Sequence, residues 1–180
     1  MLSGGVHGAG WEVSETSAVR ELLAPYCADP CLDIGFGGSA ITSRAITLDM
    51  NRPYCPSLEG HRQILRGDAR CLPFICDEAF ETVYSSHLVE DFTYAALEKV
   101  LTEWRRILRT GGNLVICAPD QQKFLAHCAK TGQALNSAHK EPDFSLRTFA
   151  EVLVKTGNWL SLVTAENLGP YSWAIVARKT

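Results

Sequence analysis

The sequence lacks the patterns that mark several large classes of protein. It has seven cysteines, an odd number, and no two of them stand in a Cys-x-x-Cys pair. Such a set favours reduced thiols over a disulfide framework, and its closely spaced cysteines have no histidine partners of the kind that zinc sites use. We therefore expect a cytoplasmic protein without a metal site.

Long apolar runs and a basic surplus are also missing. No run of about eighteen apolar residues occurs, and the first twelve residues do not resemble a secretory signal. The net charge is −3, whereas non-specific nucleic-acid binding needs a basic surface. We expect neither a membrane nor a nucleic-acid partner. Oligomeric state cannot be inferred from these features.

What is present fits one folded unit. A chain of 180 residues with 46% hydrophobic content is long enough for one buried core and too short for two ordinary domains. We expect a single domain over 1–180, with 1–13 as a loose N-terminal arm. Short apolar segments alternate with helical patterns or turns, which predicts an α/β fold. The expected strands are 31–34, 45–49, 63–66, 80–85, 114–117, 159–165 and 172–177, and the expected helices are 14–26, 93–108, 122–130 and one capped by Ser145.

A glycine-rich turn follows the first expected strand. Gly35 and Gly37 let the backbone turn sharply and approach a ligand closely, because neither carries a Cβ. Asp49 ends the next strand, where a carboxylate can accept both hydroxyls of a ribose. The turn and Asp49 together predict a nucleoside site.

Residues 33–39, DIGFGGS, resemble the first motif of class I S-adenosylmethionine-dependent methyltransferases, with Ser39 in place of the last glycine. The same letters fit a looser dinucleotide-binding pattern that ends at Ala40. Asp33 favours the first reading, because a carboxylate attracts the ammonium of a methionine moiety and repels a pyrophosphate. Residues 104–116, WRRILRTGGNLVI, are very like the family's approach to its fifth strand. Residues 80–91 resemble its fourth-strand segment, with Asp91 in place of a histidine.

The resemblance implies a Rossmann-like, mostly parallel sheet of seven strands with helices on both faces and the last strand antiparallel. It is trimmed around the first two crossovers, since only about two helical turns fit between 37 and 45, and prolines interrupt 50–61. The resemblance also implies S-adenosyl-L-methionine as the cofactor. Asp33 would orient its amino group, Asp49 its ribose and Asp68 its adenine. The implied cofactor residues are Asp33, Gly35, Phe36, Gly37, Asp49, Met50, Asp68, Ala69 and Ser85.

The expected reaction is methyl transfer to an oxygen or nitrogen of a small molecule such as a sugar. His87 is the first candidate for a general base and His139 the second, although His87 could equally cap a turn. Residues 120–144 would form a lid over the acceptor site, with Asn136 and Tyr171 as substrate residues. Two alternatives remain: a nicotinamide-dependent oxidoreductase, and a catalytically idle methyltransferase-like binding module.

Overall fold

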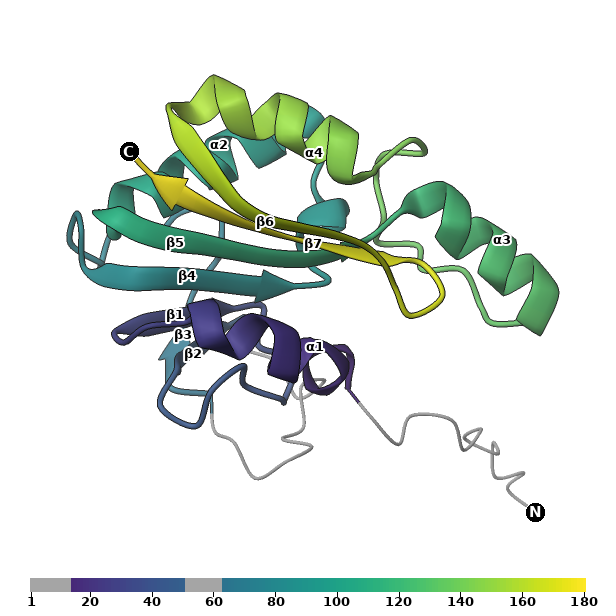
Figure 1. Cartoon of the computed structure of the whole chain (residues 1–180), viewed down its shortest axis with the longest axis horizontal. Helices are drawn as coiled ribbons and strands as arrows, with labels where there is room; N and C mark the ends of the chain where they lie inside the picture. Colours follow the sequence, from purple (N-terminus) through teal and green to yellow (C-terminus); the bar gives the residue numbers. More distant parts are fainter. Residues whose placement is uncertain (1–13, 51–62) are drawn as a thin grey trace, which may run out of the picture.

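A seven-stranded sheet forms the centre of the computed structural model, which describes residues 14–50 and 63–180 (Figure 1). The predicted N-terminal arm and the predicted loop that replaces the second crossover helix lie outside the described residues. The strand order is β3-β2-β1-β4-β5-β7-β6. The strands are β1 Cys31–Ile34, β2 Ile46–Asp49, β3 Leu65–Arg66, β4 Phe80–Ser86, β5 Leu108–Pro119, β6 Trp159–Leu168 and β7 Ser172–Lys179.

Six of the strands share one direction. β1 pairs in parallel with β2 and β4, β2 with β3, and β4 with β5. β7 is inserted between β5 and β6 and runs antiparallel to both. All four residues of β1 are buried, as expected for a central parallel strand that is covered on both faces. The predicted fold class is confirmed.

Helices cover both faces of this sheet (Figure 1). α2 and α4 lie on one face, where Trp104 and Phe149 belong to the larger core cluster. α1 lies on the other face, where Val19 and Leu23 belong to a second core cluster. The helices are α1 Glu15–Leu23, α2 Tyr94–Ile107, α3 Gln121–Thr131 and α4 Leu146–Leu153, with short 3₁₀ turns at Ala24–Tyr26, Val89–Asp91 and Val154–Thr156.

The predicted helix caps are present. Ser14 accepts a hydrogen bond from the Ser17 amide at 3.0 Å and begins α1. Ser145 begins α4 with a capping box in which it and Thr148 satisfy each other's backbone amides. Phe144 and Phe149, on either side of this cap, are both buried against Trp173. The first turns of these helices are therefore determined by local sequence.

Two details of the predicted helices are wrong. α2 was expected to reach residue 108 and to have Arg109 beside its last turn, but it ends at Ile107, because Leu108 belongs to β5 and pairs with Phe80 of β4. Arg109 is a strand residue and bonds Glu81 at 2.6 Å. Leu22, expected on the apolar stripe of α1, is 39% exposed.

The first crossover is shorter than predicted. Between β1 and β2 the chain makes turns only, without a helix, so α1 provides the cover that a crossover helix would otherwise give. The Arg20 guanidinium donates to Ser39 Oγ and to the Ala40 carbonyl, both at 2.9 Å. Ala40 and Ile41 share the core cluster of α1. The glycine turn is thus packed directly against α1.

Candidate functional site

A cavity of about 400 Å³ lies where β1, β2, β3 and β4 end. Ligands of open α/β sheets bind at this carboxyl edge. Six of the nine predicted cofactor residues line the cavity, and they come from three separate loops. These six are Gly35, Gly37, Asp49, Met50, Asp68 and Ala69.

The glycine turn and Asp49 hold each other in place. Gly35 and Gly37 have φ values of 73° and 58°, a region that residues with a Cβ rarely adopt. The Gly37 amide donates to Asp49 Oδ2 at 3.2 Å, and the Met50 amide donates to Asp49 Oδ1 at 2.7 Å. The Asp49 carboxylate is therefore fixed at the wall of the cavity, at the end of β2.

Asp68 and Ala69 form the wall after β3. Asp68 is paired with the Arg70 guanidinium, whose Nη2 lies 2.6 Å from Asp68 Oδ2, and this hydrogen bonding lowers the pKa of Asp68. The Ala69 carbonyl accepts a hydrogen bond from Trp104 Nε1 at 2.9 Å. Since Trp104 is fully buried in α2, the backbone at this wall is anchored to the core.

The other three predicted cofactor residues lie behind the cavity wall. Asp33 is 2% exposed and accepts a hydrogen bond from the Ile41 amide at 2.8 Å. Burial raises its pKa to about 8. Phe36 packs in the core cluster of α1, and Ser85 Oγ donates to the Ile34 carbonyl at 2.9 Å. These three residues brace the glycine turn from below.

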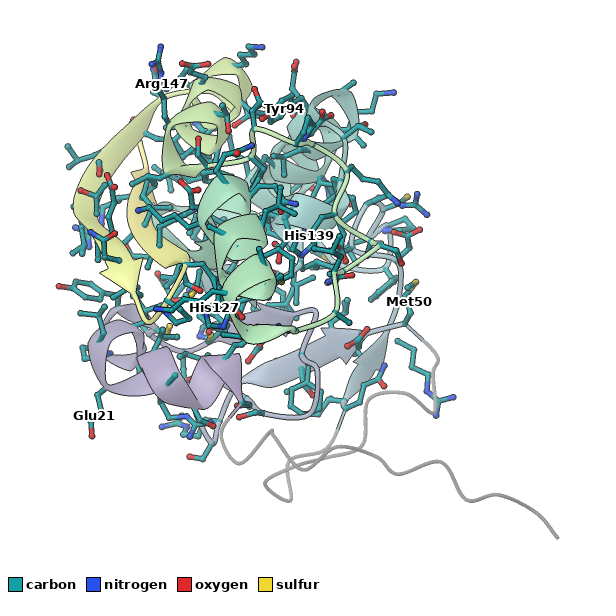
Figure 2. The ribbon with its side chains drawn as sticks, turned by 90° about the vertical axis from the view of Figure 1, so that its right-hand side faces the viewer. Glu21, Met50, Tyr94, His127, His139 and Arg147 are labelled. Carbon is teal, nitrogen blue, oxygen red and sulfur yellow. The ribbon has the colours of Figure 1, made fainter. Side chains whose placement is uncertain are left out.

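A second cavity, of about 280 Å³, shares Glu15 and His87 with the first as lining residues. All four predicted catalytic and substrate residues line it: His87, His139, Asn136 and Tyr171. Figure 2 looks toward this end of the sheet, with α3 in front and His139 beside it, while Met50 of the first cavity lies at the edge. The two cavities therefore adjoin each other at Glu15 and His87.

Both histidines are neutral at neutral pH. Burial, with a smaller contribution from the charge of His139, lowers the pKa of His87 to about 3. Burial also lowers the pKa of His139. His139 Nδ1 lies 2.6 Å from Gln121 Oε1, and because that oxygen only accepts, Nδ1 carries the proton and Nε2 has the free lone pair. His87 has a φ of 50° and Nε2 3.2 Å from Ser172 Oγ.

Three acidic residues of the site were not predicted from the sequence. Glu15 lines both cavities, Glu90 lines the second and Asp91 lines the first. Burial raises the pKa of each, to about 7 for Glu15, to about 6 for Asp91 and well above its usual range for Glu90. Glu90 and Asp91 closely follow His87 at the end of a central strand, a position that could have identified them. Glu15 has the appearance of an ordinary first-turn acid.

Comparison with known proteins agrees with this fold. The model of a family described as "Methyltransferase domain" matches residues 32–116. No curated protein matches the sequence. Solved structures with the same fold include a protein of Pyrococcus horikoshii, with 18% identity, a TM-score of 0.70 and coverage of 91% of this chain and 88% of the other. Another is a SAM-dependent methyltransferase of Archaeoglobus fulgidus, with 20% identity, a TM-score of 0.68 and coverage of 91% and 94%. A third, from Thermotoga maritima, is described as a possible histamine N-methyltransferase, with 18% identity, a TM-score of 0.66 and coverage of 90% and 89%.

Residues 32–116 thus match a methyltransferase domain, and the chain has the Rossmann-like fold of these solved structures, as the resemblance predicted. S-adenosyl-L-methionine is the cofactor that this domain match implies. No helix within 14–50 or 63–180 is long and apolar enough to cross a membrane.

Proposed function

We propose that this protein transfers a methyl group from S-adenosyl-L-methionine to an oxygen or nitrogen of a small-molecule acceptor. A nucleic acid is not the expected acceptor. The observation that supports this most strongly is the pair of cavities that share Glu15 and His87 at the carboxyl edge of the sheet. Each has a distinct lining, and the larger lies within the usual volume range of ligand sites, about 300–1,000 Å³. A cofactor and an acceptor would meet at the shared residues.

The residues of the larger cavity suit the cofactor. Asp49 would hold the ribose hydroxyls, and Asp68 with Ala69 would contact the adenine, against which Met50 would pack. Asp91 lines the same cavity, and its Oδ1 is buried without a hydrogen-bond partner among the described residues. A buried acceptor of this kind favours a donor such as the cofactor's ammonium. We assign Asp33 the different role of fixing the glycine turn through the Ile41 amide.

The bound cofactor supplies an electrophilic methyl group, and its sulfur leaves as a neutral thioether, so the protein need only position the acceptor and exclude water. α3 and the connector that follows it, within 120–144, would act as the lid. The connector is tied to the site where the Lys140 amide donates to the Glu90 carbonyl at 3.0 Å. His87 and His139 would present neutral nitrogens to the acceptor, because burial lowers the pKa of both. A pKa of about 3 makes His87 a weak proton acceptor.

Calorimetric titration with S-adenosyl-L-methionine, its demethylated product and NAD tests this proposal. We expect micromolar binding of the first two and no binding of NAD. Asp49→Ala should weaken cofactor binding at least about tenfold, because it removes the carboxylate that faces the ribose position. Asp77→Ala is the matched control, since Asp77 is exposed and pairs with Arg106 away from the cavity. Absence of binding would overturn the proposal and favour a binding module.

A further inference from the structure

The second cavity has acidic side chains in its lining but no lysine or arginine from the described part of the chain. Glu15 and Glu90 both face it. His87 and His139, also in its lining, are held neutral by burial. A phosphate or carboxylate in this space would have no cation to bind it and would oppose the ionisation of the two acidic residues. The lining thus disfavours an anionic acceptor.

Glu90 has an unsatisfied oxygen at this cavity. The residue is 1% exposed, and its Oε2 has no hydrogen-bond partner among the described residues. Its Oε1 lies 3.5 Å from His87 Nδ1 and 3.8 Å from His139 Nε2, distances too long for strong hydrogen bonds. Buried polar atoms are nearly always hydrogen-bonded. Glu90 therefore lacks a donor that a ligand in this cavity would provide.

Aromatic rings form another part of the same lining. The rings of Phe124 and Tyr171 meet edge to face with centroids 5.2 Å apart, and the ring of His139 lies 4.9 Å from that of Phe124. Aromatic faces attract cations through the quadrupole of the ring, and this attraction is much weaker for a neutral hydroxyl. A carboxylate together with aromatic rings is a combination that suits an ammonium group.

We propose that the second cavity binds a small primary or secondary amine as its ammonium ion, with an N–H directed at Glu90 Oε2. This inference rests on the proposed methyltransferase function and names its acceptor class. The ammonium stabilises the ionised form of Glu90, which releases its own proton to solvent as the ammonium binds and then takes one N–H proton. The nitrogen keeps the electron pair of that bond and becomes a neutral nucleophile, and Glu90 becomes a carboxylic acid. The other titratable groups of the described residues around Glu90 are Glu15, Asp91, His87, His139, Cys117 and Tyr171. Burial raises the pKa of Glu90, which strengthens it as a proton acceptor.

The inference can be tested without turnover by measuring how small molecules bind to the protein saturated with S-adenosylhomocysteine, the demethylated product of the cofactor. The probes are two matched sets: phenethylamine, phenethyl alcohol and phenylacetate, and cyclohexylamine with cyclohexanol. We expect at least one amine to bind about tenfold or more tightly than its alcohol, and phenylacetate to bind weakest. Glu90→Gln keeps the shape but removes the charge, so it should abolish the preference for the amine. Glu98→Gln, at an exposed position of α2, is the control and should retain the preference.

The outcomes separate the two proposals. Failure to bind S-adenosylhomocysteine would refute the proposed function itself. If that product binds while neither amine binds, or while the alcohols bind as tightly as the amines, the amine assignment is overturned. An unchanged preference in Glu90→Gln would overturn the role of Glu90. Product binding and thermal unfolding report whether each variant is folded. If Glu90→Gln does not fold, Glu90→Asp and the wild-type ratio of amine to alcohol affinity decide the question.

Discussion

Substitution of Gly35 by alanine tests how closely the glycine turn is packed against the segment after β4. A Cβ at this position would lie 2.8 Å from Leu88 Cδ2 and 3.1 Å from Leu88 Cβ. The end of the leucine side chain can rotate away, but its Cβ moves only with the backbone. The positive φ of 73° costs alanine about 1–2 kcal/mol, and the overlap adds about 1 kcal/mol or more. We expect Gly35→Ala to lower the free energy of unfolding by about 2–3 kcal/mol.

Urea denaturation of a small set of variants separates the two contributions. Gly132→Ala is the matched control, because Gly132 has a φ of 76° and a Cβ added there would have no atom of the described residues within 4 Å, so only the backbone cost of about 1–2 kcal/mol applies. In a Leu88→Ala background, which removes the Cδ2 contact and keeps the Cβ contact, Gly35→Ala should cost less than in the wild type but still more than this control. Since Gly35 and Leu88 both line the first cavity, Gly35→Ala should also weaken S-adenosylhomocysteine binding. Equal costs for Gly35→Ala and Gly132→Ala, or no effect of Leu88→Ala, would refute the reasoning.

Three further predictions concern buried side chains. The folded pKa of Asp33, about 8, lies above its ordinary value of 3.8, so this group lowers the stability of the protein as pH rises through that interval. Asp33→Asn should therefore be more stable than wild type by about 2–4 kcal/mol near pH 8. The difference should vanish near pH 4, and urea denaturation at the two pH values measures it. The folded pKa of His87, about 3, lies below its ordinary value of 6.5, so the stability of the protein falls as pH drops below 6.5. Between about pH 7 and pH 5 the free energy of unfolding of His87→Asn should therefore fall by about 2 kcal/mol less than that of the wild type. Phe149→Ala should cost about 3–5 kcal/mol because Phe149 is fully buried, whereas Phe74→Ala, at a side chain that is 54% exposed, should cost less than about 1 kcal/mol.

The sequence predicted well those features that depend on neighbouring residues. The first strand and its glycine turn, the Ser145 cap of α4 and the long amphipathic α2 all follow from spacings of a few positions, and the structure has them. The end of α2 was less predictable, because pairing of Leu108 with Phe80 decides it, and that contact joins distant parts of the chain.

The site was only partly predictable for the same reason. Asp49 and Asp68 follow strands whose ends meet at one edge, so their place on the cavity wall could be inferred. A carboxylate at the end of a strand has the same sequence pattern whether it faces a ligand or a backbone amide, so the burial of Asp33 against Ile41 could not be inferred. Glu15 reaches both cavities only because α1 packs where a crossover helix is absent, which no local pattern encodes.

The position of Glu15 links α1 to the occupancy of the site. Glu15 is the first residue of α1, and it lines both cavities, so a ligand in either one contacts this helix as well as the sheet. A ligand that binds only when α1 is packed on the sheet stabilises this packed state by mass action. The stabilisation is about 2.7 kcal/mol when the ligand concentration is a hundred times its dissociation constant. Local opening of α1 should then become rarer as each ligand binds. Amide hydrogen exchange in α1 should therefore become slower when a ligand occupies either cavity, without a matching change in β6.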